Sequence, residues 1–473
     1  MIISKKPTDR YYAVYMIVLL HGFGMLMTWN MWITIAPAYY MEYKLIGMDR
    51  NGTKYVSSYA ANFLSYLILA SNLPNFTLNL INLLFNFKGS LEKRITLSLA
   101  VMALICLITL ILTVIDTSRM VTVFFIITIT TVAIQNAACG LYQNSLYGLV
   151  AVFPPQYTNA ILLGSNICGT FVSVVNIITI VATNDIKTAA FFYFFISFLA
   201  VLTCFGSLFI LVKLDFYQYY MQKAIEKMEK RNLDGILVEY KQNNSNINKI
   251  GLKSNNCEVS KHTNISNSGD IDLLTINFRM KLYLYYDVFK KIRMQCFNIW
   301  FIFVVTIALF PTVMADVKVY SENGIYSFVI PEKLFTPVTT YFFFNLFAFF
   351  GSFLANFVHW PQPKWLVVPV IIQVAFIPLM LICNFRSAHR TWKILIYNTW
   401  VYIALAISMS LCSGYFSALA LMYAPKQVEA SKSTIAGMIA AFFLMFGVIC
   451  GTLLTFVILW FIDSVGPLQP TKL

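Results

Sequence analysis

The chain carries few charged side chains for its length. Lys and Arg number 34 and Asp and Glu number 20, so only 11% of 473 residues are charged, while 59% are hydrophobic. Soluble domains contain roughly 25% charged residues. This scarcity excludes an ordinary soluble globule and indicates a protein embedded in a lipid bilayer.

Acidic residues are absent from the interior of the long apolar runs, since Asp116 and Asp463 fall near their ends. A proton relay or a sodium site inside a membrane would need a carboxylate at that depth. The four histidines, His21, His262, His359 and His389, are scattered, and the apolar runs contain no paired carboxylates and no nucleophile beside a base. We therefore predict that the chain is not an enzyme and holds no metal or cofactor.

Eight of the nine cysteines lie in or beside apolar runs, and only Cys257 lies in a polar segment. They have neither metal-ligand spacing nor an extracellular pairing pattern, so we interpret them as reduced thiols. No cleavable signal peptide is evident, and the apolar segment that begins near Tyr11 is expected to stay as a membrane anchor.

Hydrophobic windows separated by polar breaks predict an all-α polytopic membrane protein with eleven transmembrane helices. The expected spans are 12–39, 60–85, 95–115, 120–152, 158–182, 188–212, 296–314, 335–358, 365–383, 393–423 and 434–462. They predict an N-terminal six-helix bundle (1–212), a cytoplasmic loop (213–295) and a C-terminal five-helix bundle (296–473).

The distribution of Lys and Arg predicts the orientation, because basic residues gather in cytoplasmic segments. Most of them lie in the segments that are cytoplasmic if the N-terminus is inside, and above all in the loop 213–295. An odd number of spans then places the C-terminus outside. The net charge of +14 is thus a topology signal and not a nucleic-acid footprint.

Two of the loops are expected to differ in character. In the central loop, 241–269 is rich in Asn, Ser and Lys and is predicted to be disordered, whereas its flanks have aromatic and basic residues suited to a membrane surface. In the first extracellular loop, Asn51-Gly-Thr53 is the expected glycosylation site.

Uncharged polar side chains recur inside the spans at helical spacing. Asn136, Gly140, Gln143 and Tyr147 share one face of the fourth span, and Tyr341, Asn345, Ala348 and Ser352 form a stripe in the eighth. Small residues at this spacing also permit close helix packing. Amides and aromatic rings together suit a flat heteroaromatic ligand, because rings stack and amides hydrogen-bond to its edge.

Several motifs together resemble the equilibrative nucleoside transporter family. They are Asp9-Arg-Tyr11 with Gly22-x-Gly24 and Trp29-Asn30, Gln143-Asn-Ser145-Leu-Tyr-Gly148, Phe153-Pro-Pro-x-Tyr157-Thr, Phe310-Pro311, Trp360-Pro361, Gly414-Tyr415, Ala424-Pro425-Lys and Gly447-x-x-x-Gly451. The resemblance covers nearly everything from Asp9 to about Phe461 except the central loop. It implies a fold like a major-facilitator protein without its last helix, in a 6+5 arrangement.

The resemblance also implies a substrate cavity between the two halves. The substrate-binding residues would be Leu26, Trp29, Asn30, Ile33, Gln143, Tyr341, Asn345, Ser352 and Val448, with Gln143 reading the nucleobase. The structural glycines would be Gly22, Gly24, Gly164, Gly169, Gly447 and Gly451.

One departure from the family concerns the eighth span. The family has an Asp and an Arg where this chain has Ala348 and Ser352. Both charges are absent together, as expected for a pair whose members cannot be buried singly. The change puts recognition of the ribose in question.

The sequence therefore predicts a facilitative, uncoupled transporter of nucleosides that works by alternating access in the plasma membrane. Two alternatives stay open: a nucleobase transporter of the same fold, and a membrane receptor or scaffold that transports nothing. The expected partners are a small nucleoside or nucleobase and the lipid bilayer, and the oligomeric state is left open.

Overall fold

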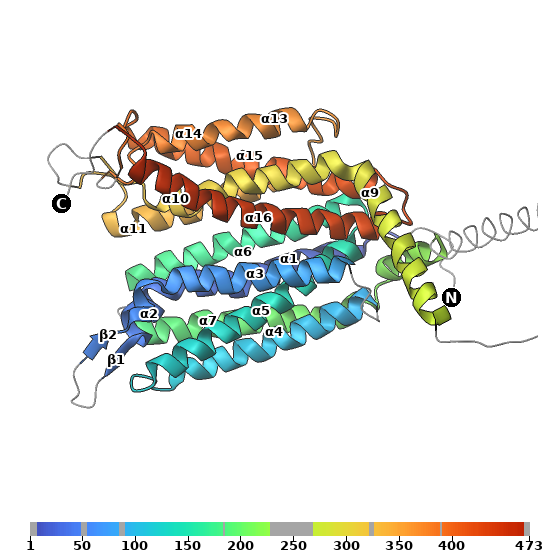
Figure 1. The fold of residues 1–473 in the computed structure, drawn as a ribbon, viewed down its shortest axis with the longest axis horizontal. Helices are drawn as coiled ribbons and strands as arrows, with labels where there is room; N and C mark the ends of the chain where they lie inside the picture. The colour runs from blue at the N-terminus through green and yellow to red at the C-terminus, as the bar shows by residue number, and fades with distance from the viewer. Residues whose placement is uncertain are drawn as a thin grey trace, which may run out of the picture.

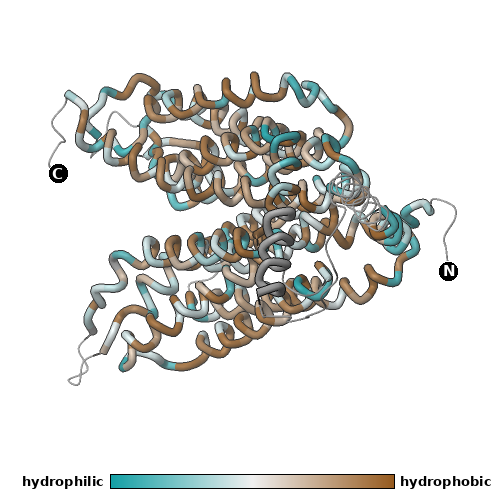
Figure 2. The backbone as a smooth tube through the Cα atoms, turned by 45° about the vertical axis from the view of Figure 1, so that its right-hand side comes forward, coloured by the Kyte–Doolittle hydropathy of each residue, from teal (hydrophilic) through white to brown (hydrophobic). Residues whose placement is uncertain are grey.

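A computed structural model describes residues 7–48, 54–84, 90–182, 185–227, 268–320, 326–387 and 390–467. The expected glycosylation site at Asn51 and the loop segment 228–267 lie outside these residues. The long helices run roughly side by side, and apolar residues cover most of their length (Figures 1 and 2).

The N-terminal half consists of helices α1 to α7. They are α1 (Ala13–Ile35), the short α2 (Ser58–Ala61), α3 (Phe63–Leu84), α4 (Leu91–Val114), α5 (Val121–Val150), α6 (Pro155–Ala182) and α7 (Ile186–Leu211). A 3-10 turn, Arg10–Tyr12, precedes α1, and a π-helix, Ala36–Lys44, continues it. Residues 215–227 are also helical.

The C-terminal half consists of helices α9 to α16. They are α9 (Ser268–Leu309), α10 (Thr312–Ala315), α11 (Glu332–Thr336), α12 (Phe343–Leu354), α13 (Val367–Ile372), α14 (Phe376–Leu381), α15 (Thr399–Lys426) and α16 (Ser433–Ser464). A π-helix, Pro337–Phe342, joins α11 to α12, and a 3-10 turn, Gln373–Ala375, joins α13 to α14.

Ten helices of the described chain are long and apolar enough to cross a membrane. The expected ninth span, 365–383, is a shorter apolar stretch, Val367–Leu381, which contains Pro369 and Pro378. Proline lacks the amide hydrogen that a helix uses, so this stretch divides into short pieces. The structure thus confirms a helical membrane protein, and the eleven-span count stays a prediction.

Two local features differ from the expectation. The first loop contains a short antiparallel hairpin, in which β1 (Ile46–Met48) pairs with β2 (Lys54–Val56). Helix α9 continues through residue 295, where the cytoplasmic loop was expected to end, because no Gly or Pro interrupts 270–309. The domain limits 1–212, 213–295 and 296–473 stay a prediction.

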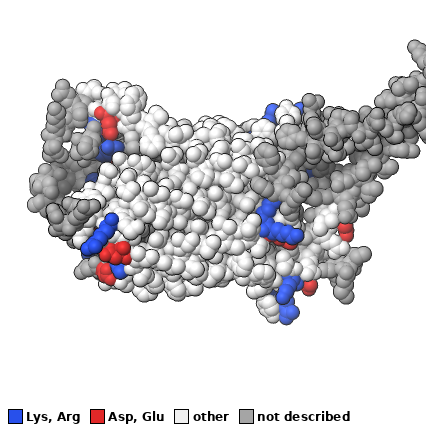
Figure 3. All heavy atoms as spheres, turned by 60° about the horizontal axis from the view of Figure 1, so that its bottom comes forward, with Lys and Arg blue, Asp and Glu red and all other residues white. Residues whose placement is uncertain are grey.

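The charged side chains gather at the two ends of the helices and leave a broad uncharged band between them (Figure 3). At one end Lys432, beside the start of α16, pairs with Asp287 at 2.6 Å. At the other end Arg386 pairs with Asp463 at 3.2 Å. This arrangement fits a molecule whose middle is surrounded by hydrocarbon. Which end faces the cytoplasm stays a prediction.

Four helix pairs pack most extensively, and each contains a glycine against a partner backbone. The pairs are α1 with α6, α9 with α16, α3 with α5, and α12 with α15. A Cβ atom on Gly22, Gly164, Gly140, Gly351, Gly414 or Gly447 would collide with a carbonyl oxygen of the facing helix. Close approach of backbones is how helices associate where lipid supplies no hydrophobic drive. Close packing of a helix pair through glycine therefore occurs in both halves.

The two halves meet along other helices. Helix α16 packs on α3 and α5, and α6 packs on α12 and α15. These contacts surround the cavity described next.

Candidate functional site

A cavity of about 240 Å³ lies at the contact between the two halves. It is lined from the N-terminal half by Met25, Leu26, Trp29, Asn30, Asn72, Asn75, Asn136, Cys139, Gln143, Tyr147, Leu162, Ser165 and Asn166. From the C-terminal half it is lined by Phe303, Thr306, Ile307, Phe310, Phe344, Asn345, Ala348, Ser413, Gly414, Ser417, Leu444, Met445 and Val448. All these residues are uncharged. The wall combines amides, hydroxyls and aromatic rings.

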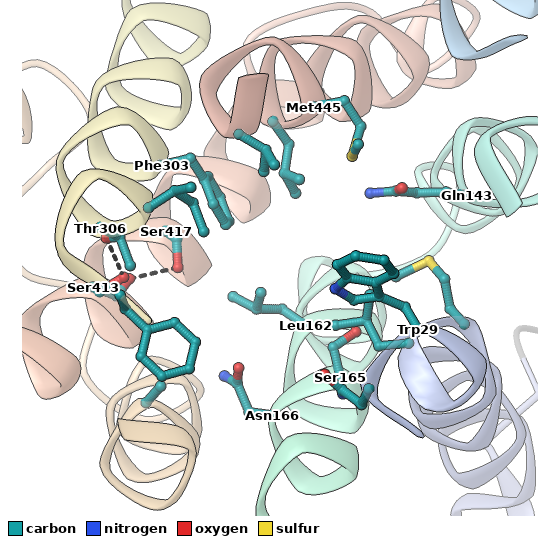
Figure 4. A pocket seen from close by; sticks show the side chains of 18 of the residues that line it. Trp29, Gln143, Leu162, Ser165, Asn166, Phe303, Thr306, Ser413, Ser417 and Met445 are labelled. Atoms are coloured by element: carbon teal, nitrogen blue, oxygen red, sulfur yellow. Dashed lines mark hydrogen bonds between the residues drawn. The ribbon is translucent and has the colours of Figure 1, made fainter. Parts of the chain in front are cut away.

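Trp29 and Gln143 define one side of the cavity, where both side chains point inward (Figure 4). Gln143 comes from α5 on the same face as Asn136 and Tyr147, which also line the cavity. The Gln143 amide has no hydrogen-bond partner among the described residues, and only 4% of the residue is exposed. It is thus free to offer a donor and an acceptor to a ligand.

The opposite side belongs to α9, α12 and α15. Phe310 stacks on Phe344 with ring centroids 3.7 Å apart, which gives this wall a flat apolar surface. Next to it, the hydroxyls of Thr306 and Ser413 lie 2.8 Å apart (Figure 4). Ser417, one turn further along α15, donates its hydroxyl hydrogen to the Ser413 carbonyl at 2.6 Å.

Six of the nine residues expected to bind substrate line this cavity. They are Leu26, Trp29, Asn30, Gln143, Asn345 and Val448. Asn30 donates a long hydrogen bond to the Cys168 sulfur at 3.6 Å, and Asn345 donates to the Tyr341 carbonyl at 2.8 Å. Their role in binding substrate stays a prediction.

Ile33, Tyr341 and Ser352 do not line the cavity. Ile33 packs against the apolar core of the N-terminal half. The Tyr341 ring lies behind Phe310, edge to face at 5.9 Å. Ser352 is fully buried against α6, where its hydroxyl accepts a hydrogen bond from Asn166 at 3.1 Å.

The expected structural glycines lie where helices approach closely. Gly22 and Gly164 meet backbone atoms across the contact of α1 and α6, and Gly447 and Gly451 meet α9. Gly24 faces the Cys204 side chain, and Gly169 faces the Asn345 side chain of the other half. A side chain at any of these six positions would force a neighbour to move.

The comparisons with known proteins agree with this architecture. The family model described as Nucleoside transporter matches residues 129–460. The chain belongs to the nucleoside transporter family. Equilibrative nucleoside transporter 1 of Homo sapiens is 27% identical over 96% of this chain and 98% of its own length. Equilibrative nucleoside transporter 2 of Homo sapiens is 25% identical over 95% and 97%. The family resemblance predicted from the motifs is confirmed.

A solved structure supports the fold. The major facilitator superfamily proton:xylose symporter XylE, bound to 6-bromo-6-deoxy-D-glucose, superposes with a TM-score of 0.56 at 9% sequence identity. The match covers 95% of this chain and 89% of the symporter. The expected major-facilitator-like fold of this nucleoside transporter family member is confirmed.

Several cavity residues were not predicted from the sequence. Asn72 and Asn75 on α3 share a face because they are three residues apart, and Thr306 and Ser413 come from α9 and α15. A polar residue within an apolar span was the signal available for each of them. The sequence alone does not tell which of many such residues face one cavity.

Proposed function

We propose that this chain carries nucleosides across the membrane by facilitated diffusion. The observation that carries the proposal is the uncharged cavity between the halves, with the Trp29 ring and the Gln143 amide on one side (Figure 4). A nucleobase is flat and has hydrogen-bonding groups along its edge. Trp29 offers a surface on which it stacks, and Gln143 offers one donor and one acceptor for its edge.

The uncharged wall supports uncoupled transport of a neutral solute. Amides and hydroxyls from both halves can hydrogen-bond a nucleoside without adding charge to the cavity. Binding in such a site needs no cation to enter with the substrate. Net movement then follows the concentration gradient of the nucleoside in either direction.

Alternating access fits the way the halves contact each other. Asn144 on α5 donates a hydrogen bond to the Met438 carbonyl on α16 at 2.9 Å. On the other side of the bundle, Asn159 on α6 donates to the Ser352 carbonyl on α12 at 2.7 Å. Both bonds lie toward the end where α6 and α16 begin. Breaking them would open that end while the halves rock about the cavity.

A nucleobase transporter is the second candidate. Ala348 and Ser352 replace the Asp and Arg that the family places on the eighth span, and a free base has no sugar for that pair to read. A receptor or scaffold that transports nothing is the third. We further propose the plasma membrane as the location, with the N-terminus in the cytoplasm and a glycan at Asn51.

Uptake into proteoliposomes tests the proposal. The purified full chain should admit labelled uridine and adenosine until the inner concentration equals the outer one, and preloaded vesicles should release them equally fast. Imposed proton or sodium gradients should leave both rates unchanged. Accumulation above the outer concentration would contradict uncoupled transport. Uptake of hypoxanthine without uridine would favour the nucleobase carrier, and no uptake of either would favour a receptor.

A further inference from the structure

Two hydroxyl groups of the cavity wall form a pair of their own. Thr306 on α9 and Ser413 on α15 place their side-chain oxygens 2.8 Å apart, and both residues line the cavity. We propose that this hydroxyl pair is the subsite that reads the sugar of the transported nucleoside. The inference rests on the proposed function. It adds where the sugar binds, which the proposed function leaves unassigned.

An inventory of hydroxyl hydrogens supports this assignment. Each hydroxyl carries one hydrogen and can also accept hydrogen bonds. The bond between Thr306 and Ser413 uses one hydrogen, and either residue can donate it. Neither side chain hydrogen-bonds to a further residue in the described part of the chain. One donor and several lone pairs therefore stay available to a ligand.

Nearby serines lack this free donor. Ser417 donates its hydrogen to the Ser413 carbonyl at 2.6 Å. Ser352, which was expected to meet the sugar, donates to the Ala348 carbonyl at 2.9 Å and lies outside the cavity. Serine and threonine inside a helix commonly bond back to their own helix in this way. Thr306 and Ser413 differ because they bond to each other across two helices.

The position of the hydroxyl pair matches the two-ended shape of a nucleoside. Figure 4 places Thr306 and Ser413 across the cavity from Gln143. If Gln143 holds the base edge, the sugar points toward α9 and α15. A ribose presents two neighbouring hydroxyls, and such a diol can accept from and donate to a pair of side-chain hydroxyls at once. A deoxyribose can satisfy only part of this arrangement.

The strength of the discrimination follows from the neutral chemistry of the pair. Hydrogen bonds between uncharged groups are about half as strong as charge-assisted ones. The wild-type protein should therefore bind uridine more tightly than 2′-deoxyuridine or 3′-deoxyuridine, by roughly two- to tenfold in inhibition constant. The preference should be real but modest.

Competition in proteoliposomes measures this preference. Labelled uridine uptake by the full chain is inhibited with uridine, 2′-deoxyuridine and 3′-deoxyuridine. The double variant Thr306→Val with Ser413→Ala should lose the preference for ribose and handle the three compounds alike. Thr306→Ser, which retains the hydroxyl, should keep the preference. Ser410→Ala is the matched control, because Ser410 is buried on α15, bonds to Ala406 and lies outside the cavity.

The results of these experiments distinguish a failure of the sugar subsite from a failure of the proposed transport function. If the wild-type protein takes up uridine but is inhibited equally by uridine, 2′-deoxyuridine and 3′-deoxyuridine, the proposed sugar subsite is wrong. This test requires no variant. A double variant that retains the ribose preference would also overturn the subsite. A wild-type protein that takes up no nucleoside would instead refute the proposed function. If the double variant does not fold, Thr306→Val and Ser413→Ala are each expected to reduce the preference in part.

Discussion

The side-chain amide of Asn159 donates hydrogen bonds to the Ser352 carbonyl at 2.7 Å and to the Asn356 side-chain oxygen at 2.9 Å. Asn159 belongs to α6, and both acceptors belong to the segment formed by α12 and the residues that follow it. One buried amide thus joins the two halves by two bonds. Neither bond joins residues within the same half.

Replacing Asn159 with alanine should loosen this end of the molecule. The variant removes two bonds between the halves and none within α6. Backbone amides of residues 351–358 should then exchange hydrogen for deuterium roughly tenfold faster, because each lost bond contributes about 1 kcal/mol. Ser173→Ala is the control on α6, since Ser173 bonds only to its own helix. Equal exchange in the wild type and in Asn159→Ala would show that these bonds do not hold the end closed.

Gln143→Ala should weaken transport without unfolding the protein. The variant deletes the amide that we place against the base edge, so the ligand groups it served are left unpaired, at a cost of about 1–3 kcal/mol. KM for uridine uptake should rise roughly tenfold or more. Gln135→Ala is a matched control, because Gln135 is buried on the same helix and does not line the cavity. An unchanged KM in folded Gln143→Ala protein would assign Gln143 to packing alone.

Restoring the family's charge pair should need both charges. Ala348 and Ser352 are four residues apart on α12, a spacing at which Asp and Arg can pair. Ser352 is fully buried, so Ser352→Arg alone should lower the melting temperature markedly, as an unpaired buried charge costs about 3–5 kcal/mol. Ala348→Asp with Ser352→Arg should recover most of that loss. A double variant no more stable than Ser352→Arg would show that the pair cannot form here.

Replacing tyrosine with phenylalanine should lower the melting temperature at one buried position but not at another. The Tyr142 hydroxyl hydrogen-bonds to the His21 ring, so Tyr142→Phe leaves an imidazole nitrogen unpaired and should cost about 1–3 kcal/mol. The Tyr39 hydroxyl is buried and has no hydrogen-bond partner among the residues that the structure describes, so Tyr39→Phe should be neutral or stabilising. Thermal melting of the purified variants measures both. Equal melting temperatures would contradict the contrast.

The fold could be predicted largely because a bilayer imposes strong rules on a chain. Apolar length identified the ten long helices, since each must cover about 30 Å of hydrocarbon. The rules are weaker where the chain leaves the membrane. The hairpin of Ile46–Met48 and Lys54–Val56 has strands of three residues, too short for a period-two pattern to be recognised. Aromatic and basic residues at helical spacing were recognised in 275–293, but the sequence did not indicate that this segment and the seventh span form one continuous helix, α9.

The site could be predicted in part. The face of α5 that carries Asn136, Gln143 and Tyr147 follows from helical spacing, and the structure places all three in the cavity wall. The stripe of Tyr341, Asn345, Ala348 and Ser352 was predicted in the same way, yet only Asn345 and Ala348 reach the cavity. Spacing defines which residues share a face, but it does not say how wide the cavity is beside that face. Thr306 and Ser413 are 107 residues apart in the sequence, so their pairing leaves no local pattern.

The glycine-packed helix pairs also bear on how fast such a protein could work. Within each half, helices touch backbone to backbone, so a half resists deformation as a unit. Between the halves, the bonds described here come from a few amides, such as Asn144 and Asn159. Hydrogen bonds of this kind contribute about 1 kcal/mol each, an amount that the binding of one small solute can offset. Thermal energy would then suffice for the switch between the two access states. Because each half is stiff, this motion would occur as a rotation of one half against the other and not as bending of helices.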